Sequence, residues 1–111
     1  MKTVNLHFKF VRNQFIREVR ELSFEGEDVN LANFQDPNNA YVYEGDIKGL
    51  WVIGDLEIVV NCRGLKGFVW SLEVKVDGVK LTPTPIEGKI NSRGISIHFE
   101  SYKLPVQEKE K

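Results

Sequence analysis

Apolar and polar residues alternate along several stretches of the chain. In residues 3–10, Val4, Leu6 and Phe8 fall on one side of an extended backbone, whereas His7 falls on the other. Successive side chains of a β-strand point to opposite faces, so this pattern predicts a strand with one buried face. The same alternation occurs at residues 56–62, 68–76 and 95–99, and weaker strands are expected at 41–43, 50–53 and 89–90.

The alternation also assigns individual side chains to a face. Within residues 68–76 it predicts that Trp70 is a core residue. Within residues 95–99 it places Ile97 and Phe99 on the buried face and His98 on the polar face.

One segment fits both a helix and a strand. Val11, Phe15, Val19 and Leu22 follow steps of four, four and three, which is the spacing of one helix face. The alternating reading of the same segment would instead continue the first hairpin as a second strand. The sequence therefore leaves open one short helix near residues 13–22.

Turn signals separate the predicted strands. Asp77 and Gly78 lie between Val76 and Val79, and this Asp-Gly pair is typical of a type I′ hairpin. Short connections between alternating strands favour antiparallel pairing. The predicted fold is all-β and mainly antiparallel: a β-sandwich or partly open barrel of about seven strands. We expect a single domain over residues 1–105 and a flexible charged tail at 106–111.

One of the predicted hairpins resembles a known family. The segment from Gly67 through the Asp77-Gly78 turn to Leu81 is similar to a hairpin of the Fas apoptosis inhibitory molecule family. The resemblance implies the β-sandwich fold of that family. It covers a short alternating hairpin only, so no function and no residue role is carried over.

Composition narrows the class of protein. The 111 residues, 41% apolar and 28% charged, suit one ordinary globular domain. The net charge of −1 disfavours a nucleic-acid binder, and the apolar runs are too short for a membrane span. The first residues lack a secretion signal, and the single cysteine, Cys62, cannot form an intramolecular disulfide. We therefore expect a cytoplasmic protein.

Motifs for catalysis or cofactors are not found in the sequence. It contains no CxxC pair, no Cys/His cluster and no glycine-rich phosphate loop, so we expect no metal and no cofactor. His7 and His98 fit solvated positions on sheet faces, and Cys62 fits a small buried apolar residue. These features favour a non-enzymatic protein over an enzyme.

Acidic residues are concentrated in the middle of the chain. Residues 25–57 carry eight acidic residues against Lys48 alone, and both flanking segments are basic. Four aromatic residues, Phe34, Tyr41, Tyr43 and Trp51, lie in the same segment. The apolar neighbours of Trp51 favour the core for its ring, whereas the two tyrosines are the better surface candidates. Such a surface would attract a basic partner.

We therefore expect a non-catalytic protein–protein interaction module, of the adaptor or immunity type, that binds a basic protein partner. The expected binding residues are Asp36, Tyr41, Tyr43, Glu44, Asp46 and Trp51. One alternative is a small-ligand or carbohydrate-binding β-sandwich that uses the aromatic residues. Another is a structural or assembly subunit, which would associate with itself.

Overall fold

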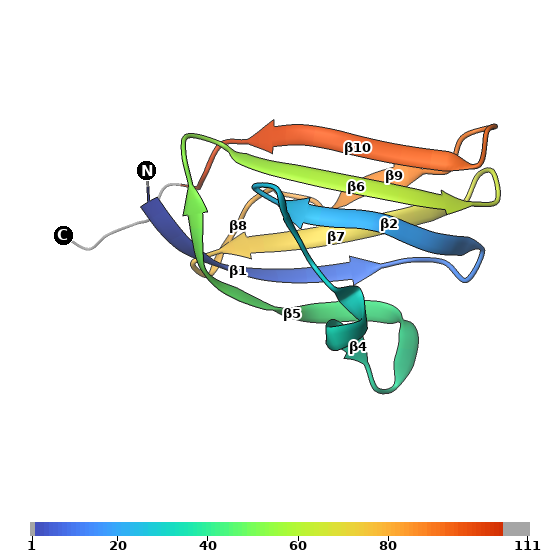
Figure 1. The fold of residues 1–111 in the computed structure, drawn as a ribbon, viewed down its shortest axis with the longest axis horizontal. Coiled ribbons are helices and arrows are strands. Elements are labelled where there is room, and N and C mark those ends of the chain that lie inside the picture. Colours follow the sequence, from blue (N-terminus) through green and yellow to red (C-terminus); the bar gives the residue numbers. More distant parts are fainter. Residues whose placement is uncertain (1, 106–111) are drawn as a thin grey trace.

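Two antiparallel sheets pack face to face in the computed structural model, which describes residues 2–105 (Figure 1). Sheet A has the strand order β4-β5-β1-β7-β8, and β9 also pairs with β7. Its strands are β1 (Lys2–Val11), β4 (Gln35–Asp36), β5 (Asn39–Val52), β7 (Val69–Val76), β8 (Val79–Lys80) and β9 (Ile86–Lys89). Sheet B has the order β10-β6-β2-β3. Its strands are β2 (Ile16–Phe24), β3 (Glu27–Asp28), β6 (Leu56–Gly64) and β10 (Ile95–Tyr102).

The predicted antiparallel β-sandwich is confirmed, and the two sheets do not close into a barrel. The number of described strands exceeds the expected number because three of them, β3, β4 and β8, are only two residues long. One core between the sheets receives side chains from both of them, as expected for a single domain. The expected tail at 106–111 lies outside the described residues. Within residues 2–105, no helix has the length and apolar character needed to cross a membrane.

Two local predictions are confirmed. Asp77 and Gly78 have φ angles of 49° and 86°, and positive φ at both central residues defines the type I′ turn that joins β7 to β8. Trp70 is fully buried between the sheets.

The helix considered for residues 13–22 is wrong, because this segment contains the start of β2. Two irregularities in its pairing with β6 each insert one extra residue into β2. As a result, the residues that face the core, Ile16, Val19 and Leu22, are three positions apart rather than two. Bulges therefore gave a strand the spacing of a helix. In the turn before β2, the side chain of Asn13 accepts a hydrogen bond from the backbone N–H of Phe15.

The orientation predicted for residues 95–99 is also wrong. Ile97 and Phe99 point outward from β10 with 65% and 67% of their surface exposed. Ser96 and His98 point inward, where the indole N–H of Trp70 donates to Ser96 Oγ at 3.0 Å and the rings of Trp70 and His98 pack edge to face. A buried indole N–H needs an acceptor, so Trp70 selects the polar face of β10.

The 3-10 turn η1 (Leu31–Phe34) packs against β5. The Phe34 ring lies directly over Gly45 of β5 and meets Phe8 edge to face at 5.2 Å. A Cβ atom at Gly45 would collide with this ring. The contact fixes η1 against the strand that carries most of the predicted binding residues.

Candidate binding surface

Three predicted binding residues share the outer face of β5, which we call the β5 face: Glu44, Asp46 and Trp51. Glu44 and Asp46 alternate with the inward residues Tyr43 and Gly45. Trp51 has the opposite parity, yet it also points outward and is 60% exposed. The expectation that its ring enters the core is therefore wrong.

A bulge in β5 explains the position of Trp51. Between the pairs Val4↔Leu50 and Leu6↔Ile47, β5 contains one residue more than β1. Gly49 lies in this bulge with a φ of +69°, and its N–H donates to the side chain of Asn5 at 3.0 Å. The extra residue reverses the alternation, so Leu50 is buried and Trp51 is exposed.

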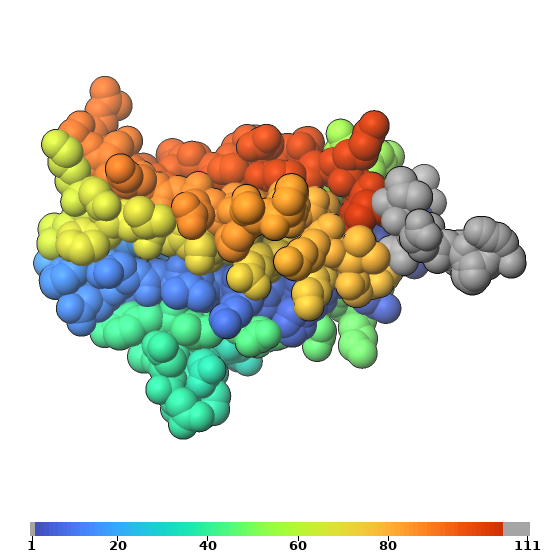
Figure 2. Space-filling view, turned by 180° about the vertical axis from the view of Figure 1, so that it is seen from behind, coloured from blue at the N-terminus to red at the C-terminus, as the bar shows by residue number. Residues whose placement is uncertain are grey.

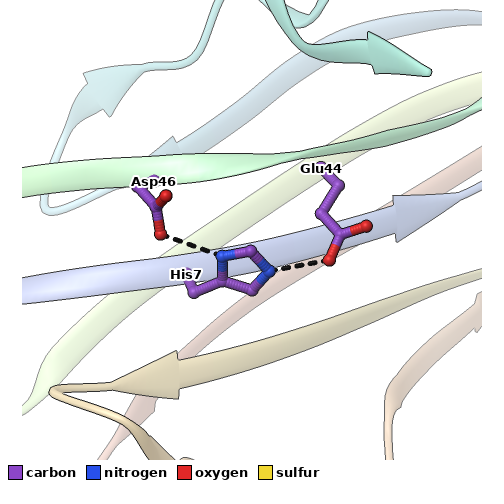
Figure 3. Close-up of polar contacts among 3 residues, drawn as sticks. All are labelled: His7, Glu44 and Asp46. Carbon is purple, nitrogen blue, oxygen red and sulfur yellow. Dashed lines mark hydrogen bonds and ion pairs between the residues drawn. The ribbon is translucent and has the colours of Figure 1, made fainter. Parts of the chain in front are cut away.

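His7 of β1 lies between the two carboxylates of the β5 face (Figure 3). Its Nδ1 is 2.9 Å from Asp46 Oδ1, and its Nε2 is 2.7 Å from Glu44 Oε2. Asp46 is directly opposite His7 in the strand pairing, whereas Glu44 is opposite Lys9 and reaches His7 diagonally. Both ring nitrogens are therefore engaged by carboxylates.

The carboxylates raise the pKa of His7 above its usual value of 6.5. The hydrogen bond with Asp46 is the largest cause, followed by that with Glu44, while partial burial opposes them. The imidazolium form is favoured because it can donate from both nitrogens to negatively charged oxygens.

Charge changes sign across the outer face of sheet A. The two carboxylates lie on β5, while Lys75 of β7 is paired beside His7 and Lys80 of β8 is paired beside Lys75. Figure 2 shows this side of the molecule, where β5, β1 and β7 lie next to one another. Glu73 of β7, paired beside Lys9 of β1, adds one carboxylate outside β5, so Glu44 and Asp46 form the acidic pair of this face.

The two tyrosines do not join this face. Tyr43 is buried, and its hydroxyl accepts a hydrogen bond from Arg12 Nε at 3.0 Å. The guanidinium of Arg12 also lies 5.0 Å from the ring centre of Tyr41, which is 37% exposed. Tyr41 and Trp51 lie near opposite ends of β5, so the aromatic residues do not line one groove.

The remaining acidic residues of segment 25–57 lie elsewhere. Asp36 accepts the backbone N–H of Asn38 at 2.7 Å, which makes it part of the turn between β4 and β5. Glu25 is hydrogen-bonded to the backbone of Glu57, so the tip of the β2–β3 hairpin lies beside the start of β6. The acidic segment is thus divided among the β5 face, the β4–β5 turn and the place where the β2–β3 hairpin meets β6.

The contacts of His98 and Cys62 indicate structural roles for these two side chains. His98 Nε2 is 2.7 Å from the hydroxyl of Tyr102, and the two rings stack. Burial raises the pKa of the Cys62 thiol to about 12. His7 and His98 belong to different sheets, so their rings do not form a pair.

Sequence reasoning did not include His7 among the binding residues. Its neighbours on β5 are about forty positions away in the chain, and the alternation within one strand carries no information about pairing at that distance. Only a weak indication of a role for His7 was present: it is a polar residue on the same predicted outward face as Lys9.

Over residues 2–105, no group of three or more His, Cys, Asp and Glu side chains is arranged to hold a metal ion. Comparisons with protein-family models, with curated proteins and with solved structures each found no match to this chain.

Proposed function

We propose that this protein is a non-catalytic interaction module that binds a basic, extended segment of a partner protein along the β5 face. The observation that carries the proposal is the position of Glu44, Asp46 and the 60% exposed ring of Trp51 on one face of one strand. Carboxylates and exposed aromatic rings are both groups that recognise arginine or lysine side chains.

The chemistry of the face suits an extended partner. Carboxylates accept charge-assisted hydrogen bonds from guanidinium or ammonium groups, and an indole ring attracts a cation placed over it. The distance from Glu44 to Trp51 along the strand is roughly 20 Å, at about 3.3 Å per residue. An extended peptide of similar length could contact the carboxylates and the indole together.

The environment of His7 supports binding rather than catalysis. A catalytic base needs a ring nitrogen directed at a substrate, but both nitrogens of His7 face the carboxylates at 2.7 and 2.9 Å. The buried, protonated thiol of Cys62 is likewise a poor nucleophile. Because a lone buried thiol suits a reducing compartment, we also propose a cytoplasmic location.

Affinity capture tests the proposal. The tagged protein is incubated with lysate of its source cells at low salt, and the retained proteins are identified by mass spectrometry. We expect a stoichiometric partner that is lost when Glu44→Gln, Asp46→Asn and Trp51→Ala are combined. Its affinity should fall as ionic strength rises, since salt screens contacts between exposed charges.

A matched control makes the same carboxylate changes in the other sheet: Glu27→Gln and Asp28→Asn. Both side chains are exposed and belong to β3 of sheet B. The control should retain the partner. Equal loss in both variants, or a partner retained by the β5-face variant, would reject the β5 face as the binding surface.

A further inference from the structure

β10 forms a long border of sheet B. It extends over eight residues and, within residues 2–105, pairs with β6 alone (Figures 1 and 2). The other borders differ: β3, β4 and β8 have two residues each, β9 has four, η1 packs on β5, and β2, which extends beyond β3, carries two bulges.

This border lacks the usual protection against pairing with another strand. Proteins commonly place lysine, proline or a bulge on exposed edge strands. The sequence of β10 contains neither lysine nor proline, and its register with β6 is continuous from Ile95 to Tyr102. Its outward side chains include the exposed apolar residues Ile97 and Phe99.

Hydrogen bonds at the start of β10 establish which backbone groups point away from β6. The carbonyl of Gly94 accepts from Gly64 N–H at 3.0 Å, toward β6. The N–H and the carbonyl of Ile95 instead form hydrogen bonds with Asn91, in the turn on the side away from β6. Backbone direction alternates along a strand, so the N–H and C=O groups of Ile97, Phe99 and Ser101 point away from β6.

We propose that a second copy of this chain pairs antiparallel along β10, with a two-fold axis at Phe99. In this register Phe99 lies opposite Phe99 of the second copy, and Ile97 lies opposite Ser101. Each such pair exchanges both of its N–H···O bonds. In this register, the backbone groups of all three residues that point away from β6 form hydrogen bonds. The pairing joins the two four-stranded sheets into one.

The side chains are complementary in the same register. On the outer face, the two phenylalanine rings meet at the axis as a cross-strand aromatic pair. On the inner face, His98 lies opposite Glu100 of the second copy, which places an imidazole beside a carboxylate on each side of the axis. This match of the strand with itself is the reason for choosing a second copy as the occupant.

Sedimentation equilibrium over a range of protein concentrations tests the proposal. The molar mass of the wild-type chain should approach twice the 12.8 kDa of one copy. Phe99→Lys places like charges at the axis, and Ser101→Pro removes an N–H that points away from β6. Both variants should therefore remain at the mass of one chain. Both should also stay folded, because neither change removes a bond to β6.

Ile53→Lys is the matched control, since Ile53 is equally exposed at 71% and lies outside β10; it should associate like the wild type. Amide hydrogen exchange gives a second readout that needs no variant. The amides of Ile97, Phe99 and Ser101 should become protected as concentration rises.

A wild-type mass of one chain at every concentration would overturn the proposal. So would association of both β10 variants, or association without protection of the three amides. None of these changes touches Glu44, Asp46 or Trp51, so the outcome is independent of the proposed binding of a basic partner.

Discussion

The indole of Trp70 links the two sheets. From β7 of sheet A, its N–H donates to Ser96 of β10, and its ring packs against His98 of the same strand. The ring also lies 5.8 Å from Phe10 and directly over Gly88, where a Cβ atom would collide with it. This one side chain therefore fixes both the distance between the sheets and the orientation of β10.

Removal of the Ser96 hydroxyl should destabilise the fold. Ser96→Ala leaves the buried indole N–H without an acceptor, which costs about 1–3 kcal/mol of unfolding free energy. Urea unfolding followed by tryptophan fluorescence measures the change. Ser101→Ala, on the same strand and exposed, should have little effect; an equally small effect of Ser96→Ala would mean that the hydrogen bond is not needed.

Protonation of His7 should stabilise the fold. Because the folded-state pKa is raised, the stabilisation is fully present below pH 6.5 and is lost as pH increases through the raised pKa. The loss should be at most about 1 kcal/mol, the range for solvent-exposed ion pairs. Urea unfolding across this pH range measures it. In His7→Gln this contribution should disappear, and a variant with the same pH dependence as the wild type would contradict the assignment.

At this scale, alternation predicted the burial of Trp70 but not the inward orientation of Ser96 and His98. Hydrophobicity ranks Ile97 and Phe99 as the core residues of their strand. The requirement that decides the outcome is a hydrogen-bond acceptor for an indole N–H on a strand of the other sheet. A pattern read within a single strand does not contain that requirement.

Among the elements, β2 and β5 depart most from regular strands. Each contains extra residues relative to the strand beside it, and each departure changes which side chains face outward. In β5 the bulge brings Trp51 to the same face as Glu44 and Asp46. The proposed binding face therefore depends on the backbone at Gly49.

Gly49→Ala should weaken this element. A residue with a β-carbon is strained at a φ of +69°, so we expect a loss of about 1–2 kcal/mol in unfolding free energy. Thermal unfolding measures it, with Lys48→Ala as the control in the same bulge. An unchanged melting temperature for Gly49→Ala would indicate that the bulge adjusts without strain.

Bulges also limit what could be predicted about elements. Where strands are regular, as in β6 and β7, the alternation identified them and the faces they bury. In β2 the two extra residues gave Ile16, Val19 and Leu22 a spacing closer to that of a helix. Bulges are set by pairing with another strand, so the local sequence does not reveal them.

For the whole molecule, the sequence predicted the sandwich but not the order of its strands. Short turns identify pairs such as β7 and β8, which are adjacent in the chain. The neighbours of β1, in contrast, are β5 and β7. This long-range pairing is what brings His7 to Glu44 and Asp46.

The central place of β1 in sheet A has a consequence for synthesis on the ribosome. Leu6 is translated well before both of its strand partners, Ile47 and Val76. The nascent chain thus carries an apolar strand with an open side until Val76 has been translated. Closing such distant contacts is slow, so β1 is the segment that a chaperone would have to shield during translation.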